Sequence, residues 1–230
     1  MNKKKIVALV PLKANSERVP GKNFRQLGDR PLFAWIIDTL LSVADIDQVV
    51  INTDARSILA ENGLVETDRL KIRDRKPELC GDFVSMNLIL EDDIHHCDAD
   101  IFLMTHVTNP FISAVTVQSA LDTYVKARDK YDSLFSVNKI QSRFYREDGS
   151  PLNHDPDNLI RTQDLPPLYE ENSCLYLFTS QSFDKTKARI GQVPMMYPTP
   201  LLESIDIDNA EDWYLAEALA RQLIATGVHV

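Results

Sequence analysis

Glycine and cysteine are both scarce in this chain, which has seven glycines and three cysteines among its 230 residues. A glycine-rich loop that cradles phosphate with backbone amides is therefore not expected, and any bound phosphate must be held largely by side chains. Cys80, Cys97 and Cys174 form no Cys-x-x-Cys pair. Their spacing argues against a zinc site and against a disulfide framework, and it favours the reducing environment of the cytoplasm.

The chain also lacks an excess of basic residues and any long apolar run. Its net charge of −9 argues against a general nucleic-acid binder, which would carry surplus lysine and arginine. No stretch approaches the ~18 apolar residues of a membrane span. The basic start and the apolar run 6–12 weakly resemble a signal peptide, but the run is short and Lys13 closes it. We therefore predict a first strand here, and expect neither nucleic acid nor membrane as a partner.

Strand and helix signals alternate through the first two thirds of the sequence. Short apolar runs predict strands, and amphipathic segments between them predict helices. This alternation is typical of an α/β domain with a mainly parallel sheet and flanking helices. The predicted strands are 5–12, 48–52, 101–105 and 133–138, and the predicted helices are 31–43, 55–61, 84–96 and 113–128.

The pattern loosens between residues 139 and 200, where polar loops that contain proline separate short apolar segments. We expect a small antiparallel excursion that serves as a lid or as a dimerisation arm. An amphipathic helix is predicted at 209–226, and residues 1–230 are expected to form one domain that includes the excursion. The strand candidates within the excursion are 144–146, 173–178 and 192–197.

Ligands of parallel α/β sheets bind beyond the carboxyl ends of the strands. Three polar segments follow predicted strands and should therefore share that edge, namely 13–22, 53–54 and 106–110. The first of them carries Lys13, Arg18 and Lys22 at spacings of five and four residues. Three cations on one short loop repel each other, so the loop indicates an anionic ligand, and a nucleoside triphosphate is the natural candidate. The alternative is a solvated turn before a helix.

The acidic segment 203–208 is the second candidate site. If it is a strand, Asp206 and Asp208 point to one face with Cα atoms ~6.5 Å apart, because strand residues alternate faces. Two such carboxylates can share one Mg²⁺ ion, which usually takes one or two carboxylates together with substrate phosphate oxygens. The alternative is a solvated edge strand in which Asp208 or Asn209 caps the last helix.

Three further segments carry polar residues, and each has a functional and a structural interpretation. Residues 75–79, with Asp82 and Ser85 after them, could reach a base or a phosphate, or they could be a charged helix entry. Residues 106–110 could grip a sugar, or they could form a turn. The cluster 91–96, with three acids and two histidines, is predicted to be the solvated acidic face of a helix rather than a metal site.

Several of these segments together resemble the sugar-acid cytidylyltransferases, especially the acylneuraminate branch. The loop 13–23 is similar to the family signature R-x-x-S-x-R/K-x-P-x-K-N, with Lys13 in place of the first arginine. Residues 76–82 resemble R-P-x-x-L-x-x-D, with Arg75 one place early. Residues 106–110 resemble Q-P-T-S-P, although Ile112 stands where an arginine is expected. Three more segments match in order: 161–166 resembles R-x-Q-D-L-P, 172–176 resembles N-G-A-x-Y, and 206–208 reads D-I-D.

The resemblance implies a Rossmann-like α/β domain with a dimerisation arm exchanged in a homodimer. It also implies that CTP and a sugar acid react to give the CMP-sugar acid and pyrophosphate. The residues implied for catalysis are Lys13, Arg18, Lys22 and Asp208; for the nucleotide, Ser16, Asn23, Arg75, Lys76 and Ser85; for the acceptor, His106, Thr108, Asn109, Lys139, Arg161 and Tyr176; and for Mg²⁺, Asp206 and Asp208.

Within that set, Lys139 or Arg161 is expected to bind the acceptor carboxylate, because a charged partner is worth more than a neutral one. Three alternatives remain open at this point. The acceptor is keto-deoxy-octulosonate or another molecule, the chain is a nucleotide-sugar glycosyltransferase, or it is an inactive nucleotide-binding subunit. The basic loop after the first strand argues against the glycosyltransferase.

Overall fold

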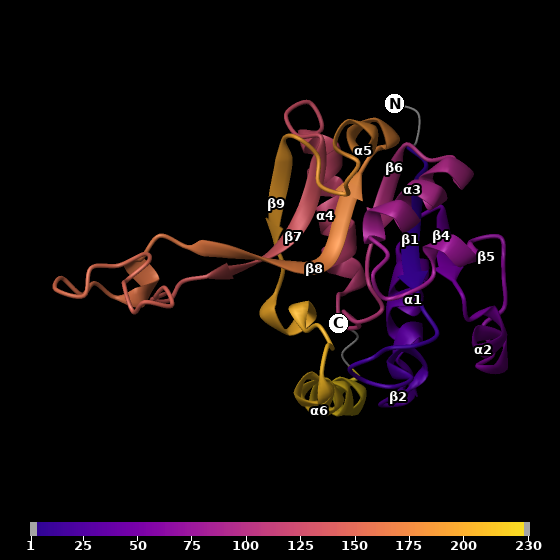
Figure 1. Cartoon of the computed structure of the whole chain (residues 1–230), viewed down its shortest axis with the longest axis horizontal. Coiled ribbons are helices and arrows are strands. Elements are labelled where there is room, and N and C mark those ends of the chain that lie inside the picture. Colours follow the sequence, from indigo (N-terminus) through magenta and orange to yellow (C-terminus); the bar gives the residue numbers. More distant parts are fainter. Residues whose placement is uncertain (1–3, 228–230) are drawn as a thin grey trace.

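A seven-stranded sheet forms the centre of the protein in the computed structural model, which describes residues 4–227 (Figure 1). Residues 1–3 and 228–230, which the one-domain prediction included, lie outside the described residues. A two-stranded ribbon of β2 (Gln26–Leu27) and β3 (Arg30–Pro31) lies apart from the sheet. The sheet order is β5 (Leu70–Asp74), β4 (Gln48–Thr53), β1 (Ile6–Leu12), β6 (Ile101–Met104), β8 (Leu168–Phe178), β7 (Ser133–Ile140) and β9 (Pro194–Pro198).

The sheet is mainly parallel, as the alternating sequence pattern predicted. Strand β1 pairs in parallel with β4 and with β6, β4 pairs in parallel with β5, and β7 pairs in parallel with β9. Strand β8 runs antiparallel to both β6 and β7. The carboxyl ends of β1, β4, β5 and β6 therefore meet at one edge, which is the edge where ligands of such sheets bind.

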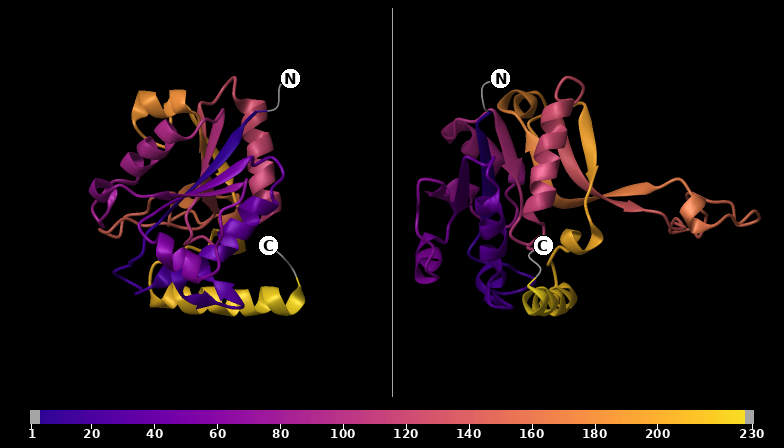
Figure 2. Two further views of the ribbon diagram at one scale, coloured as in Figure 1. Left: turned by 90° about the vertical axis from the view of Figure 1, so that its right-hand side faces the viewer. Right: turned by 180° about the vertical axis from the view of Figure 1, so that it is seen from behind.

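Helices cover both faces of the sheet because the side chains of β1 alternate between two apolar clusters. Ala8 and Val10 pack in the cluster that contains residues of α1 (Leu32–Ser42), α2 (Arg56–Glu61) and α4 (Ala114–Ala127). Val7 and Leu9 pack in the cluster on the opposite face, which contains Leu90 of α3 (Met86–His96) and Phe183 of α5 (Ser180–Thr186). Figure 2 shows these two helical layers from the side.

Helix α6 (Ala210–Thr226) lies beyond the carboxyl edge of the sheet, at the end of the molecule opposite the amino end of β1 (Figures 1 and 2). Trp213, Ala216 and Ala220 bury one face of α6 against Leu27, Leu32 and Phe111. This third cluster holds the start of α6 close to the loops that follow β1 and β6. Across residues 4–227, no helix has the length and apolar character needed to cross a bilayer.

An arm leaves the body between β7 and β8, over residues 141–167 (Figure 1). The strand predicted at 144–146 is wrong, because this segment makes only an isolated bridge between Tyr145 and Pro151. A single 3-10 turn, η3 (Thr162–Asp164), is the helical element of the arm. Apolar side chains of the arm are exposed to solvent, namely Tyr145, Leu152, Leu159 and Ile160.

Four elements, namely strands β2, β3 and β5 and helix α5, were not predicted from the sequence. Strand β5 buries Leu70 and Ile72 but alternates them with charged residues, so its apolar pattern is too short to stand out. Helix α5 has only seven residues, and its amino end is fixed by a reciprocal pair of hydrogen bonds between Thr179 and Ser182.

The acidic cluster on α3 is buried rather than solvated, so that prediction is wrong for Asp92 and Asp93. Arg73 of β5 forms ion pairs with both carboxylates, and Asn52 of β4 donates to Asp93 at 2.7 Å. Burial raises the pKa of Asp93 to about 6. The charged face therefore fastens α3 to two strands, which is possible because arginine on β5 neutralises it.

Candidate active site

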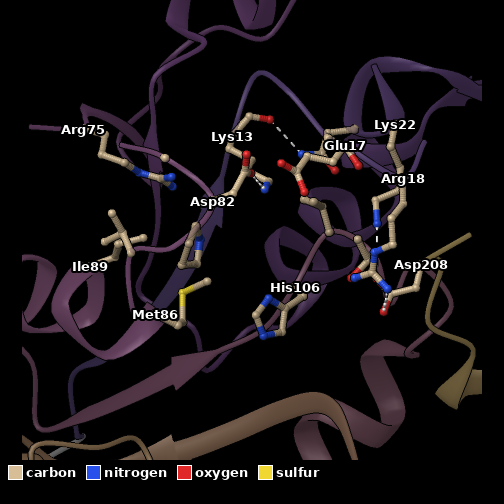
Figure 3. Close-up of a pocket in the computed structure, with 17 residues that line it drawn as sticks. Lys13, Glu17, Arg18, Lys22, Arg75, Asp82, Met86, Ile89, His106 and Asp208 are labelled. Atoms are coloured by element: carbon tan, nitrogen blue, oxygen red, sulfur yellow. Dashed lines mark hydrogen bonds and ion pairs between the residues drawn. The ribbon is translucent and has the colours of Figure 1, made fainter. Parts of the chain in front are cut away.

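A cavity of about 410 Å³ opens at the carboxyl edge of the sheet (Figure 3). Its walls come from the loop after β1, the segment after β5 together with the start of α3, the turn after β6, and Asp208 before α6. Residues from both ends of the sequence therefore line one space. Of the residues predicted for the site, the cavity is lined by Lys13, Ser16, Arg18, Lys22, Asn23, Arg75, His106, Thr108 and Asp208.

The loop after β1, residues 13–23, is closed by its own polar groups. Asn23 is buried, and its side-chain amide donates to the Lys13 carbonyl at 2.8 Å, which ties the end of the loop to its beginning. Ala14 donates its backbone N–H to Asp54 at 2.7 Å. Gly21 has a φ of 64°, a left-handed conformation that glycine adopts without steric cost, and it leads into the 3-10 turn η1 (Lys22–Phe24). The loop is thus preorganised to present its cations to the cavity.

Lys22 is buried, with 7 % of its surface exposed, and its ammonium group faces the carboxyl-terminal part of the chain. The ammonium nitrogen donates to the Ile207 carbonyl and lies 3.5 Å from the Asp208 carboxylate. Burial lowers the pKa of Lys22, while the nearby carboxylates of Asp208 and Asp206 oppose that shift. A buried cation that costs desolvation energy is expected where an anionic ligand will later replace the lost solvent.

Asp208 adjoins the basic loop at one end of the cavity, where its carboxylate also forms an ion pair with Arg18 at 3.0 Å. Its carboxylate is free for this because other side chains cap α6. Asn209 accepts from two backbone amides of the first turn, and the Asp212 carboxylate accepts from the backbone N–H of Asp208 at 2.8 Å. The cationic loop and Asp208 therefore lie on one cleft (Figure 3).

Asp206 does not line the cavity, although the charges of Asp208 and Lys22 act on its carboxyl group. The strand expected at 203–208 is wrong. The 3-10 turn η4 (Leu201–Ser204) precedes an extended segment that makes one backbone–backbone hydrogen bond within residues 4–227, donated by the Ile207 N–H to the Thr108 carbonyl at 2.9 Å. Burial raises the pKa of Asp206, and the charge of Asp208 acts in the same direction. One carboxylate oxygen of Asp206 is buried without a hydrogen-bond partner among the described residues. Two acids of this kind side by side fit a hard cation such as Mg²⁺.

The opposite end of the cavity is more apolar and holds a second buried cation. Figure 3 shows Arg75, Ile89 and Met86 at this end, with Lys22, Arg18 and Asp208 at the other. Arg75 donates to the Asn52 side chain at 2.9 Å and to the Asn52 carbonyl at 2.8 Å. Burial lowers the pKa of Arg75. A flat heterocycle can pack on the apolar wall while its carbonyl oxygen accepts from the arginine.

An ion pair between Lys13 and Asp82 spans the middle of the cavity. Sequence reasoning noted Asp82 only for its place in a motif, yet its carboxylate engages one of the three cations of the loop. Lys13 holds the pKa of Asp82 below its usual value. Because Lys13 has to leave Asp82 to meet a polyphosphate, this pair competes with the ligand.

Asp82→Asn is therefore expected to strengthen nucleotide binding. Removing the competing carboxylate frees Lys13, so the KM for the nucleoside triphosphate should fall about 2- to 5-fold, in line with the small value of an exposed ion pair. Steady-state kinetics at two ionic strengths measure this effect, which should shrink as salt rises. An increase in KM would show that Asp82 contributes to binding the nucleotide.

His106 borders the cavity on the side of β8, near an arginine that sequence reasoning missed. Arg189 lies with its guanidinium 3.4 Å from the His106 ring nitrogen and 3.9 Å above the ring of Tyr176. Burial lowers the pKa of His106 to about 3, and the charge of Arg189 acts in the same direction. His106 is therefore a neutral imidazole at physiological pH. Arg189 belongs to none of the sequence motifs, and its position after the predicted strand 173–178 is the one sequence signal that could have indicated it.

The remaining predicted residues do not line this cavity. Lys76 turns to Asp92 at 2.6 Å, Ser85 caps the amino end of α3, and Asn109 is buried with its amide directed at backbone carbonyls. Lys139 is exposed on β7, and Arg161 is exposed on the arm, where it pairs with Asp164. Tyr176 is buried, and its hydroxyl contacts Glu171 and Ser173. Within one chain, Lys139 and Arg161 therefore stand apart from the cleft because the β7–β8 hairpin carries them outward.

Ser173 has a φ of 60°, a left-handed conformation in the middle of β8. This conformation costs a residue with a Cβ about 1–2 kcal/mol, and the cost is greatest for β-branched side chains. The wild type already bears this cost at Ser173, and a β-branched side chain adds to it, so Ser173→Val is expected to lower the free energy of unfolding by about 1 kcal/mol. Ser173→Gly should stay within about 0.5 kcal/mol of the wild type, because relief of the strained conformation offsets the entropy that glycine adds to the unfolded chain. Chemical denaturation of the three proteins tests this. Equal stability of the valine variant would mean that the backbone relaxes at this bulge.

Known proteins that resemble this chain are cytidylyltransferases, which fits a cavity lined by cations and an acid. A family model described as cytidylyltransferase matches residues 7–223. The chain is 29% identical to CMP-N,N'-diacetyllegionaminic acid synthase of Legionella pneumophila subsp. pneumophila, over 94% of this chain and 96% of that protein. It is 27% identical to the N-acylneuraminate cytidylyltransferase of Oncorhynchus mykiss, over 94% of this chain but only 50% of that longer protein. The chain spans about half the length of several such relatives.

Solved structures share the fold at lower identity. CMP:2-keto-3-deoxy-manno-octonic acid synthetase, in complex with CTP, matches with a TM-score of 0.65 at 17% identity, over 95% of this chain and 99% of that one. The 4-diphosphocytidyl-2C-methyl-D-erythritol synthase of Anaerococcus prevotii also reaches a TM-score of 0.65, at 15% identity, over 96% of this chain and all of that one.

Proposed function

Because this chain belongs to the cytidylyltransferase family, we propose that it transfers CMP from CTP to the anomeric hydroxyl of a nonulosonic, sialic acid-like sugar acid and releases pyrophosphate. One observation carries the proposal: the cationic loop after β1 and Asp208 before α6 meet at one end of a single cavity, where Asp208 contacts both Arg18 and Lys22. Relatives at 29% and 27% identity that are named for nonulosonic acids support this class of acceptor.

The donor half of the site binds and orients the triphosphate. Lys13, Arg18 and Lys22 neutralise its phosphates, and they stabilise the charge that grows on the departing pyrophosphate. Ser16 and Asn23 line the same wall, and the buried oxygen of Asn23 that has no partner among the described residues is available to a ligand. Arg75 and the apolar wall of Met86 and Ile89 receive the base. Catalysis then depends mainly on placing the α-phosphorus against the acceptor hydroxyl.

Asp206 and Asp208 are the residues that would hold Mg²⁺. The unpartnered oxygen of Asp206 and the raised pKa of its carboxyl group support this assignment, because a cation there would compensate two repelling acids. When bound, the ion would neutralise phosphate charge and make the attacking hydroxyl more acidic. Asp212 holds the backbone at Asp208 and so positions its carboxylate.

The acceptor enters from the side of His106 and Thr108, which line the cavity beside Asp208. Neutral His106 can exchange hydrogen bonds with sugar hydroxyls without adding charge. We further propose a homodimer, which the exposed apolar side chains of the arm support, and a cytoplasmic location, which three free cysteines and the need for CTP support. In such a dimer, the arm could carry Lys139 and Arg161 to a partner's site.

The test is pyrophosphate release in the presence of Mg²⁺, with each of the four nucleoside triphosphates and a panel of sugar acids. We expect turnover with CTP and with N-acetylneuraminate or N,N'-diacetyllegionaminate, and little with the other triphosphates. Preference for keto-deoxy-octulosonate would move the chain to that branch of acceptors. CTP binding without any pyrophosphate release would contradict the proposal and identify an inactive nucleotide-binding subunit.

A further inference from the structure

A second, smaller cavity of about 300 Å³ lies next to the first. Met86 lines both of them, and the contact between His106 and Arg189 spans from one to the other. The second cavity is lined by Ser85, Glu171, Arg189 and Ile190 among others. An acceptor that reacts beside Asp208 can therefore extend past His106 into this space.

Arg189 is the only one of the described lining residues of this second cavity that carries a positive charge. Its side chain is 20% exposed, and the face of its guanidinium rests on the buried ring of Tyr176 at 3.9 Å. Stacking fixes the plane of the guanidinium and leaves its edge free for hydrogen bonds. The group is thus oriented before any ligand arrives, which reduces the entropic cost of binding.

Among residues 4–227, the charge of Arg189 is matched only by long contacts. Its contact with the Glu171 carboxylate is 3.5 Å long, at the limit of a hydrogen bond. The same Glu171 oxygen accepts a short hydrogen bond from the Tyr176 hydroxyl, so it is already occupied. Arg189 also contacts His106, which is neutral. A half-buried guanidinium with such partners is suited to an incoming carboxylate, which it can bind with two parallel hydrogen bonds.

We propose that Arg189 binds the carboxylate of the acceptor and thereby selects a sugar acid over a neutral sugar. The inference rests on the proposed function and adds a residue that no motif indicates. In this proposal Arg189, rather than Lys139 or Arg161, is the cation that the nucleotide-binding chain supplies to the acceptor carboxylate. Lys139 lies at the root of the arm and Arg161 lies on the arm. Glu171, which lines the same cavity, then faces the polar substituents of the acceptor.

The test compares Arg189→Met and Arg189→Lys with the wild type. Arg221→Met is a matched control, because Arg221 is exposed on α6 and forms an ion pair with Glu217 at 3.2 Å, one turn away on the same helix. The ligands are N-acetylneuraminate, N,N'-diacetyllegionaminate and keto-deoxy-octulosonate, each paired with its neutral carboxamide. Calorimetry with CMP present measures their binding without turnover, and pyrophosphate release measures KM and kcat.

We expect the wild type and Arg221→Met to bind the preferred acid about 10- to 100-fold more tightly than its carboxamide, as fits the loss of a charge-assisted hydrogen bond. Arg189→Met should abolish this difference and raise the acceptor KM by a similar factor, while the KM for CTP changes less than about 3-fold. Arg189→Lys should fall between them, because lysine keeps the charge but loses the planar fork.

Two results would overturn the inference. In one, Arg189→Met still prefers the acid over the carboxamide; in the other, the wild type itself shows no preference. Because binding is measured without turnover, the role of Arg189 is decided even if pyrophosphate release fails. Failure of pyrophosphate release in the wild type, by contrast, would count against the proposed function.

Discussion

Asp208→Asn is expected to lower kcat by roughly 10³-fold while the protein keeps its fold, since removing one electrostatic contact to a developing charge typically costs 10²- to 10³-fold. Asp208 is the carboxylate that faces both the basic loop and the acceptor side. Asparagine preserves its shape but cannot offer a full negative charge to Mg²⁺. The fold should survive because Asp212 and Asn209, rather than Asp208, cap α6.

The variant has a signature in its kinetic constants. Without the Asp208 carboxylate, Arg18 and Lys22 are free to bind the phosphates of CTP. The KM for CTP should therefore stay constant or decrease while kcat falls. Asp184→Asn is a matched control, because Asp184 is an exposed acid on α5 that pairs with Lys187 at 3.1 Å. Turnover as a function of Mg²⁺ concentration and thermal unfolding complete the measurement. A kcat within about tenfold of the wild type at saturating Mg²⁺ would contradict the metal assignment.

Lys22→Met is expected to lower kcat/KM for CTP by roughly 10²- to 10³-fold, because it removes a buried cation from the phosphate side of the cavity. Stability should change little. Burial lowers the pKa of Lys22, which means that keeping the ammonium charged destabilises the folded state, and methionine removes that cost. The loss of the hydrogen bond to the Ile207 carbonyl acts in the opposite direction. Asp208 retains its ion pair with Arg18 in the variant.

Lys71→Met serves as the control for the loss of a lysine, since Lys71 is exposed on β5 away from the cavity. Kinetics with CTP and thermal unfolding are measured on both variants. Lys22→Arg should recover only part of the activity, because the larger planar guanidinium does not fit a site shaped for an ammonium. A melting temperature that falls with little loss of activity would show that Lys22 has a structural role.

Much of this fold could be predicted because hydrophobic periodicity is strong in its central elements. Strands β1 and β6 are continuous apolar runs and β4 contains one at 49–51, as expected for strands buried on both faces. The parallel topology then puts 13–22 and 106–110 at one edge, and both segments line the cavity. Charge alone indicated the basic loop, since three cations close in sequence need an anionic partner.

Other features depend on tertiary partners that a single sequence does not display. Asp92 and Asp93 read as a solvated face, yet Arg73 neutralises them in the interior. Asp206 and Asp208 alternate as in a strand, but the segment pairs with none of the strands in residues 4–227 and is held by Thr108 and α6. Arg189 gains its position from the ring of Tyr176, and a stacking partner 13 positions away leaves no pattern in the sequence.

Lys22 and the Ile207 carbonyl that it contacts are 185 positions apart in the chain. A nascent polypeptide therefore completes β1, β4 and β6 well before the second wall of the cleft exists. A chain that stops before Asp208 would display the basic loop without its counterpart, and it would also lack the α6 side chains that cover Leu27 and Leu32. Nucleotide chemistry thus requires a segment that is synthesised after every strand of the sheet.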